Sequence, residues 1–414
     1  MKKVFLFFVF LVYITGSFAL LPILSPPEGA PPTVILISMD GFRSDYWNRG
    51  KTPHFHELIK RGTLADHLKP VFPSVTFTNH YSLVTGLFAE NHGIVNNSMW
   101  DPVIRKSFEI HNADAAVDQS VWWEGEPVWV TAERQGKRTA SMFWVGSSAE
   151  INGTRPTYWM PYDQAFPKQK RIEKVLEWLD LPLEKRPQFI TLYFEDTDLA
   201  GHRYGPDSEE VTQAIKELDD SLGLLVAGLK IRGLQKSTTL ILVSDHGMAS
   251  VKRSDRLLLN DYVKPNEAKV VGNGALVFVW PASKQAELAI LKKVDKKPGP
   301  FQLLLKEKMP ERFHFSKHRR ISPLVFLANE GWYWETGLLP SIKPAVFGMH
   351  GYDNISPRMQ AIFLAVGPNF NENKKVGEVE NIDIYSLLAH LLKLRPANTD
   401  GSYQRIERVL HLKK

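Results

Sequence analysis

The chain has 414 residues, of which 43% are hydrophobic and 23% are charged, which is typical of a packed globular protein and excludes a disordered, collagen-like or polytopic membrane protein. It contains no cysteine, which excludes disulfides, thiolate metal sites and cysteine nucleophiles, so any metal ligands must be Asp, Glu or His side chains. The formal net charge of +6 is small, and without interleaved aromatic and basic residues it does not indicate a nucleic-acid partner.

The N-terminus has the pattern of an export signal. Lys2 and Lys3 precede an apolar run over residues 4–15, and the small residues that follow allow cleavage after Ala19. We therefore expect a signal peptide at residues 1–19, with an uncleaved membrane anchor as the alternative. Both place the rest of the chain outside the cytoplasm, in the periplasm or the extracellular space. An exported protein without disulfides further favours a bacterial source.

The next segment predicts a linker and then a single folded domain. Residues 20–32 are rich in proline, which disfavours pairing in a sheet. Regular structure is expected to begin at Thr33. We expect one domain over residues 33–400, followed by a C-terminal tail over residues 401–414.

Short apolar runs alternate with segments of helical period. Buried strands are predicted at three apolar, β-branched runs, residues 34–39, 189–194 and 239–243. Helices are predicted where apolar residues recur at steps of three and four, over residues 172–179, 211–225 and 384–391. This alternation indicates an α/β fold with a mostly parallel central sheet and helices on both faces.

Residues 263–343 interrupt this alternation. The segment is basic and rich in proline, as in residues 292–298 and 317–320. A polyanion-binding patch is one interpretation of these charges. Because charge runs usually lie on solvated faces, we favour an inserted subdomain that folds against the main sheet.

Acidic and histidine residues follow the predicted strands at the positions where parallel sheets bind ligands. They are Asp40 after the first strand, Asp198 and His202 after the second, Asp245 and His246 after the third, and His350 in a glycine-flanked segment. Any one of them could be a turn residue or a hydrogen-bonded structural residue. Together, six oxygen and nitrogen ligands could hold two divalent ions with three protein ligands each and leave positions open for a substrate.

Thr76 is the candidate nucleophile. The sequence around it predicts that a helix begins near this residue, which would place backbone N–H groups and the positive end of the helix dipole at its hydroxyl. A threonine hydroxyl is a poor nucleophile at neutral pH and needs a Lewis acid beside it. Without the metal sites, Thr76 would be only a helix cap.

Seven motifs in this order resemble those of the nucleotide pyrophosphatase/phosphodiesterase family, within the alkaline phosphatase superfamily. They are Met39-Asp40-Gly41-Phe42-Arg43, Thr76-Phe77-Thr78-Asn79-His80, His92-Gly93-Ile94, Asn97, Asp198-Leu199-Ala200-Gly201-His202, Asp245-His246-Gly247 and His350-Gly351. The resemblance spans residues 33 to about 395. It implies an alkaline phosphatase-like fold of a bacterial single-domain type, without the accessory modules of the larger animal members.

The resemblance also implies the chemistry of the site. It implies two zinc ions per chain, one held by Asp198, His202 and His350 and the other by Asp40, Thr76, Asp245 and His246. Thr76 would form a covalent intermediate during hydrolysis of nucleotides and phosphodiesters to nucleoside 5′-monophosphates. Asn97 and the backbone N–H of Phe77 would hold an oxygen of the transferring phosphoryl group.

The resemblance further implies which residues bind the substrate. Phe77 and Tyr162 match a phenylalanine and a tyrosine that enclose the nucleobase, and Trp144 and Tyr193 match positions that line the pocket. Asn97 stands where monoesterases place an arginine, which favours a phosphodiester monoanion. A glycerophosphodiester or lysophospholipid (choline-type) phosphodiesterase has the same zinc core and is the alternative. A binding module that has lost catalysis is a third interpretation.

Overall fold

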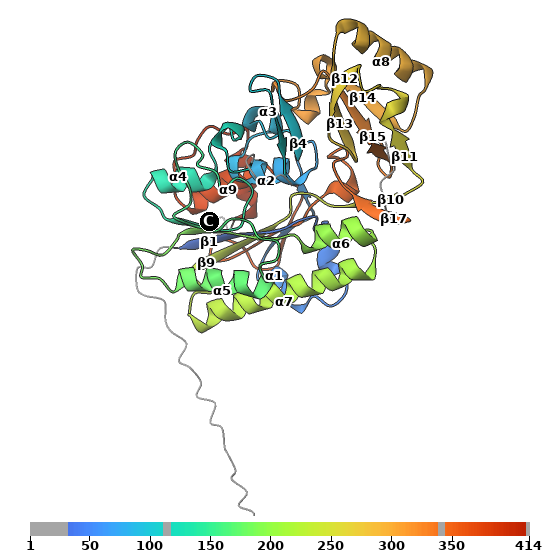
Figure 1. Cartoon of the computed structure of the whole chain (residues 1–414). Coiled ribbons are helices and arrows are strands. Elements are labelled where there is room, and N and C mark those ends of the chain that lie inside the picture. The colour runs from blue at the N-terminus through green and yellow to red at the C-terminus, as the bar shows by residue number, and fades with distance from the viewer. Residues whose placement is uncertain (1–31, 111–116, 338–343, 411–414) are drawn as a thin grey trace, which may run out of the picture.

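The computed structural model describes residues 32–110, 117–337 and 344–410 (Figure 1). The predicted signal peptide and residues 20–31 of the predicted linker lie outside the described residues. Within the described ranges, no helix is both long enough and apolar enough to cross a membrane.

The main sheet has eight strands in the order β19-β2-β18-β9-β1-β8-β6-β7. Its centre is parallel, with β1 (Thr33–Met39) between β8 (Phe189–Phe194) and β9 (Thr238–Val243). Strand β6 (Thr139–Met142) and the edge strand β7 (Tyr158–Trp159) continue the parallel pairing, and only β18 runs antiparallel to its neighbours. The remaining strands are β18 (Phe363–Val366), β2 (Gly62–Ala65) and β19 (Lys374–Val376). The mostly parallel sheet is confirmed.

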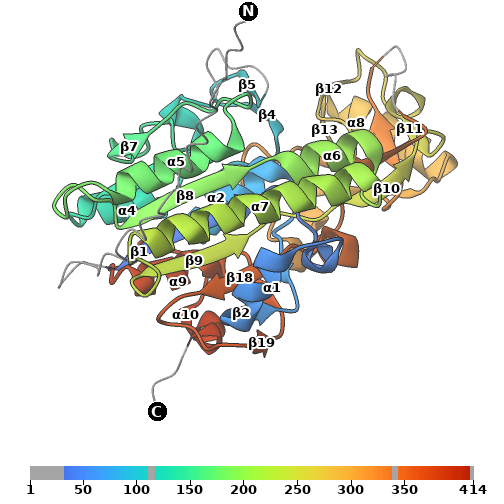
Figure 2. The same ribbon diagram turned by 90° about the horizontal axis from the view of Figure 1, so that it is seen from below.

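Helices cover both faces of this sheet, as predicted (Figures 1 and 2). One face carries α1 (Pro53–Lys60), α5 (Lys168–Leu179) and α7 (Glu209–Ile231), and α7 contacts both of the others. The other carries α2 (Thr76–Thr85), α4 (Val128–Arg134) and α9 (Asp383–Leu391). The three predicted helices are α5, α7 and α9.

Burial on both faces explains why β1 reads as a continuous apolar run. All seven of its residues are buried. Val34 and Leu36 pack into the core on the α2 side, whereas Ile35, Ile37 and Met39 pack into the core on the α7 side. A strand that faces two cores shows no alternation of polar and apolar residues.

Within the predicted insertion, the described residues up to 337 form a smaller antiparallel sheet at one end of the molecule (Figure 1). Its strand order is β12 (Ala268–Val271), β13 (Leu276–Pro281), β15 (Leu324–Ala328) and β14 (Phe301–Leu305), with α8 (Lys284–Lys296) beside it. Two strand pairs flank it, β10 (Ala249–Lys252) with β17 (Val346–Met349) and β11 (Arg256–Leu258) with β16 (Tyr333–Glu335). Because β17 ends immediately before His350, the subdomain is joined directly to the candidate site.

Short elements complete the fold. They are α3 (Ala89–His92), α6 (Asp196–Tyr204), the hairpin β4 (Ser98–Asp101) and β5 (Lys106–Glu109), the pair β3 (Leu68–Lys69) and β20 (Val379–Glu380), and α10 (Tyr403–Ile406). Helix α10 packs against α9, and Val409 and Leu410 are buried. The Thr63 hydroxyl donates to the carbonyl of Val409 at 3.1 Å. Up to Leu410, the segment predicted as a tail therefore belongs to the folded domain.

Candidate metal centre and nucleophile

The three central strands bring the predicted ligands to one edge of the sheet. Asp40 follows β1, Asp245 and His246 follow β9, and α6, which carries Asp198 and His202, follows β8. Because β9, β1 and β8 are adjacent and parallel, their carboxyl ends meet at this edge. His350 arrives from β17, whose partner β10 begins three residues after His246.

The six residues form two groups of three. The ligand atoms of Asp198, His202 and His350 lie within 4.8 Å of one another, and so do those of Asp40, Asp245 and His246. This is the division that the family resemblance implies. The groups adjoin, because the rings of His246 and His350 stack with their centroids 3.6 Å apart.

Hydrogen bonds to backbone carbonyls orient all three histidine rings. The Nδ1–H groups of His202, His246 and His350 donate to the carbonyls of Gly348, Gly247 and Ser74 at 2.9, 2.8 and 3.0 Å. A carbonyl oxygen only accepts, so the proton of each neutral ring is on Nδ1. Each Nε2 therefore keeps a lone pair that can bind a metal.

When the rings are neutral, several acceptor atoms face one another without a proton between them. Nε2 of His202 lies 3.1 Å from Nε2 of His350, and Nε2 of His246 lies 2.9 Å from Oδ2 of Asp245. Three buried carboxylate oxygens have no hydrogen-bond partner, namely Oδ1 of Asp40, Oδ1 of Asp198 and Oδ2 of Asp245. Buried acceptors in such proximity repel unless a cation lies among them. These oxygen and nitrogen donors fit two divalent ions and suit zinc.

The pKa values of Asp40 and His350 are also shifted in the directions expected at a site for bound cations. Burial raises the pKa of Asp40 well above its ordinary value, and the neighbouring Asp245 and Asp198 raise it further. Burial also holds the pKa of His350 well below its ordinary value, with His246 and His202 adding to the effect. The site therefore favours the neutral, ligating form of His350, and bound cations would relieve the crowding of negative charge at Asp40.

Thr76 is the first residue of α2, as predicted. Its hydroxyl oxygen lies 3.3 Å from Nε2 of His246, beside the group that also contains Asp40 and Asp245. The side chain is half-buried at the N-terminus of a ten-residue helix. The hydroxyl thus faces both the candidate metal ligands and the positive end of a helix dipole.

Asn97 and Phe77 are hydrogen-bonded to each other, whereas both were expected to contact a phosphoryl oxygen. The backbone N–H of Phe77 donates to Oδ1 of Asn97 at 2.9 Å. This bond occupies the N–H that was expected to hold a phosphoryl oxygen. It also orients the Asn97 side chain, because with Oδ1 engaged the Nδ2 group is left as the donor for an anion.

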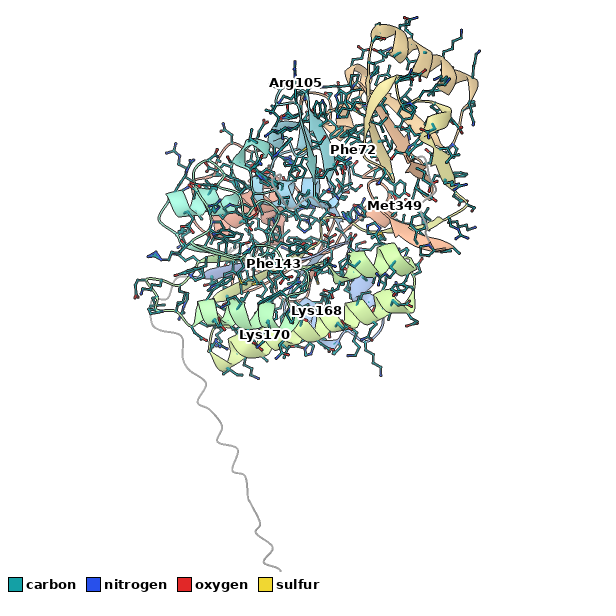
Figure 3. The ribbon with its side chains drawn as sticks, viewed as in Figure 1. Phe72, Arg105, Phe143, Lys168, Lys170 and Met349 are labelled. Carbon is teal, nitrogen blue, oxygen red and sulfur yellow. The ribbon has the colours of Figure 1, made fainter. Side chains whose placement is uncertain are left out.

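The predicted substrate-binding aromatics have different surroundings. Phe77 is half-buried and lies against Phe108 and Trp123, with ring centroids 5.8 and 6.3 Å away. Tyr162 is 54% exposed and packs edge-on against Phe143 and Tyr193. Figure 3 labels Phe143 near the central sheet, below α2.

Tyr193 and Trp144 form hydrogen bonds to residues at the candidate site. The Tyr193 hydroxyl donates to Oδ2 of Asp40 at 2.7 Å, so this residue holds a candidate metal ligand. Trp144, predicted to line the pocket, is only 6% exposed, and its indole N–H donates to the carbonyl of His80 at 3.1 Å. Trp144 therefore packs against α2, and its place on the pocket wall stays a prediction.

Sequence reasoning missed the residues that hold the ligand loops in place. The Ser244 hydroxyl donates to Oδ1 of Asp245 and accepts from the N–H of Phe42, which ties the ends of β9 and β1 together. The Thr197 hydroxyl donates to the carbonyl of Asp40. The available signal was their position, since each directly precedes a predicted ligand.

A family profile described as type I phosphodiesterase / nucleotide pyrophosphatase matches residues 34–353. Venom phosphodiesterase of Naja atra is 38% identical over 395 residues, which cover 93% of this chain and 47% of the relative. Ectonucleotide pyrophosphatase/phosphodiesterase family member 1 of Homo sapiens is 38% identical over 392 residues, covering 92% of this chain and 42% of the relative. The chain thus spans about half the length of these curated relatives. The predicted bacterial source stays a prediction.

Solved structures give the same assignment. Murine ectonucleotide pyrophosphatase/phosphodiesterase 5 superimposes with a TM-score of 0.87 at 35% identity, covering 92% of this chain and all of that one. An inactive threonine-to-alanine variant of the same murine protein in complex with AMP matches equally well. Together with the profile match, these likenesses show that the chain belongs to the type I phosphodiesterase / nucleotide pyrophosphatase family.

Proposed function

We propose that the chain is a two-zinc nucleotide phosphodiesterase/pyrophosphatase that releases nucleoside 5′-monophosphates through a covalent intermediate on Thr76. The observation that carries this proposal is the position of the Thr76 hydroxyl. It stands at the N-terminus of α2, 3.3 Å from Nε2 of His246 and next to two groups of three metal-ligating side chains. Few arrangements other than an in-line attack on phosphorus use all of these features together.

The grouping of the donor atoms supports one assignment of the ligands. Asp198, His202 and His350 would hold one zinc ion, and Asp40, Asp245 and His246 the other, with Thr76 beside it. When bound, two such ions supply Lewis-acid stabilisation of the attacking and leaving oxygens.

In the proposed reaction, Thr76, the first turn of α2 and Asn97 position the reacting groups. Thr76 Oγ1 gives its proton to solvent and forms a bond to phosphorus, while the bond from phosphorus to the leaving-group oxygen breaks and that oxygen departs with the electron pair. The first turn of α2 favours the anionic phosphoryl group through the positive end of the helix dipole. Asn97, oriented by the Phe77 N–H, presents Nδ2 to a non-bridging oxygen. Attack of water on phosphorus then releases the monophosphate and restores Thr76.

Aromatic side chains near the site support a nucleotide as the substrate. Phe77 directly follows the nucleophile, and the exposed ring of Tyr162 packs on Tyr193, whose hydroxyl holds Asp40. Such rings offer stacking surfaces to a nucleobase. The AMP complex of the murine relative supports the same ligand class.

The test replaces Thr76 by Ala in the full chain. We expect hydrolysis of a nitrophenyl ester of a nucleoside 5′-monophosphate to fall at least about a thousandfold, because the covalent step is lost. Thr85→Ala is the matched control. It removes a hydroxyl from the other end of α2, where Thr85 Oγ1 donates to the Tyr81 carbonyl at 2.7 Å. Equal loss in both variants, or full turnover by Thr76→Ala, would overturn the assignment.

A substrate panel separates the proposal from the alternative lipid activity. Rates on ATP, a dinucleotide and glycerophosphocholine are measured with the same zinc-loaded protein. Faster release of AMP than of phosphocholine supports a nucleotide pyrophosphatase, and the reverse order supports the choline-type phosphodiesterase.

Export is a further part of the proposal. It is supported by the basic and apolar pattern of residues 1–19 and the proline-rich segment after it. N-terminal sequencing of the protein from its native host checks it, with a mature chain beginning at Leu20 as the expected result. Recovery from the cytoplasm with Met1 intact would contradict export.

A further inference from the structure

His80 is a buried histidine that the metal groups do not use. It lies one turn after Thr76 on α2, its exposed fraction is 0%, and it belongs to neither group of candidate ligands. Its ring nevertheless lies at the junction of the nucleophile helix and the ligand-bearing ends of β1 and β9. A polar ring in such a place needs a reason, because burying it without partners is costly.

The hydrogen-bond partners of the two ring nitrogens of His80 determine which nitrogen carries the hydrogen. Nδ1 lies 2.9 Å from the carbonyl oxygen of Thr76 and 3.4 Å from Oδ2 of Asp245. Both oxygens are acceptors, so Nδ1 carries the hydrogen and donates it to the Thr76 carbonyl, with Asp245 close by. Nε2 lies 2.8 Å from the hydroxyl of Ser38, which therefore donates to the ring.

These contacts join the parts of the site that must keep their spacing. The Thr76 carbonyl belongs to the residue that carries the nucleophile, and Asp245 is a candidate metal ligand. Ser38 lies in β1 two residues before Asp40, the ligand that shares a group with Asp245. His80 thus links the first turn of α2 to both strands that supply this group.

Neighbouring aromatic rings hold the imidazole in place. Trp144 packs edge-on against it at 5.2 Å between centroids and donates its indole N–H to the His80 carbonyl. Tyr193 packs edge-on from another side at 5.3 Å, and its hydroxyl donates to Asp40. With two hydrogen bonds and two ring contacts, the imidazole has little freedom to rotate.

We propose that His80 is a positioning residue that sets the distance between the Thr76 hydroxyl and the metal group formed by Asp40, Asp245 and His246. It touches neither the substrate nor the reacting atoms. Its effect comes from geometry, since a misplacement of about 1 Å at reacting groups costs roughly a hundredfold in rate.

The test compares His80→Phe and His80→Asn in the full zinc-loaded protein. Phe keeps a ring of similar size without nitrogens, whereas Asn keeps an N–H donor near the position of Nδ1. We expect His80→Phe to lower kcat by about a hundredfold with KM changed by less than about threefold. His80→Asn should recover at least about tenfold of that loss, because the bond to the Thr76 carbonyl is restored.

His92 provides the matched control. It is also fully buried, and its Nε2 also meets a serine hydroxyl, Ser82 Oγ at 2.9 Å. Its other contacts are the ring of Tyr81 and the N–H of Ile94. His92→Phe should lower the melting temperature as His80→Phe does and leave kcat unchanged. Loss of kcat in both Phe variants alike, or no rescue by Asn, would overturn the proposal.

A spectroscopic readout separates this inference from the proposed function on which it rests. Each protein is loaded with Co²⁺ in place of zinc, and its visible absorption is recorded without substrate. We expect a shifted spectrum for His80→Phe and the wild-type spectrum for His92→Phe. If the wild type cleaves no diester but this difference holds, the proposed function fails and the positioning role stands. If the wild type cleaves diesters and His80→Phe changes neither spectrum nor kcat, only the positioning role fails.

Discussion

The protons on the histidine rings determine which ring nitrogen is available to a metal. Each of the three candidate ligands gives its Nδ1–H to a backbone carbonyl, and these carbonyls come from different segments, Gly348, Gly247 and Ser74. The ligating nitrogen is therefore set by the tertiary fold. Sequence spacing could predict the six candidate ligands, five of them because they follow predicted strands, but it could not predict which ring nitrogen is left free to bind a metal.

The same limit explains the aromatic residues. Tyr193 was predicted to line the pocket, and the structure shows its hydroxyl bonded to Asp40. Trp144 was predicted there as well, and it is packed under His80. Both residues lie near the site, but family motifs cannot show the direction in which a side chain points.

Removing the Tyr193 hydroxyl should weaken the metal group that contains Asp40. In Tyr193→Phe the Asp40 carboxylate loses a donor at 2.7 Å, and loss of such a supporting hydrogen bond typically costs about ten- to a hundredfold in metal affinity. Zinc titration against a competing chelator measures this. Tyr158→Phe is the control, because its hydroxyl donates to the carbonyl of Lys185, away from the ligand groups. Unchanged zinc affinity in Tyr193→Phe would contradict the role.

At the scale of elements, the site depends on how closely α6 approaches β17. A side-chain carbon built on Gly348 would lie 2.4 Å from the carbonyl oxygen of Gly201 and 2.8 Å from Sδ of Met248. Glycine therefore allows β17 to lie directly against the helix that carries Asp198 and His202. Met349, labelled in Figure 3, ends β17 and directly precedes His350.

Long, strongly patterned elements were predictable, and short ones were not. The runs 34–39 and 189–194 and the helical pattern over 211–225 correspond to β1, β8 and α7. Helix α7 also has a local start signal, since the Ser208 side chain accepts from the N–H of Val211. Strand β17 has only four residues and one exposed end, so no periodicity marks it, although it delivers His350.

Gly348→Ala should separate α6 from β17. The added methyl would contact backbone atoms that cannot turn aside, so we expect a loss of about 1–3 kcal/mol in the free energy of unfolding. Zinc binding should weaken too, because Nε2 of His202 and of His350 would move apart from 3.1 Å. Denaturant unfolding and zinc titration measure the two effects. Gly377→Ala, where the nearest side chain is 3.8 Å away, should change neither.

At the scale of the whole molecule, a buried charge cluster joins the subdomain to the main domain. Arg320 and Asp101 are both fully buried and form an ion pair at 2.8 Å. Arg320 also donates to the carbonyls of Gly93 and Trp122. The sequence predicted a basic insertion over 263–343, but it could not show that Arg320 faces inward, because its buried partner comes from the distant strand β4.

Glu124 belongs to this cluster and gives it a pH dependence. His318 accepts the Arg320 N–H at Nδ1, so its Nε2–H donates to Glu124 at 3.2 Å. This bond, with the charges of Arg320 and Arg319, lowers the pKa of Glu124 to about 2. A carboxyl whose pKa is lower in the folded state stabilises the fold above its unfolded pKa, about 4.3, and loses that contribution as the pH falls toward 2.

We therefore expect the stability difference between wild type and Glu124→Gln to depend on pH. Because Glu124 is 37% exposed, solvent screening reduces its contribution, and we expect the wild type to be more stable by about 1 kcal/mol at pH 6. The difference should shrink steadily between about pH 4.5 and pH 2.5, as the wild-type carboxylate becomes protonated. Urea unfolding of the metal-free proteins, followed by tryptophan fluorescence, measures this stability difference without interference from zinc release.

Glu150→Gln, at a 58% exposed side chain, is the control and should show a small stability difference that stays constant with pH. If the difference in the free energy of unfolding between wild type and Glu124→Gln stays the same from pH 6 to pH 2.5, the charge of Glu124 does not hold the subdomain to the main domain.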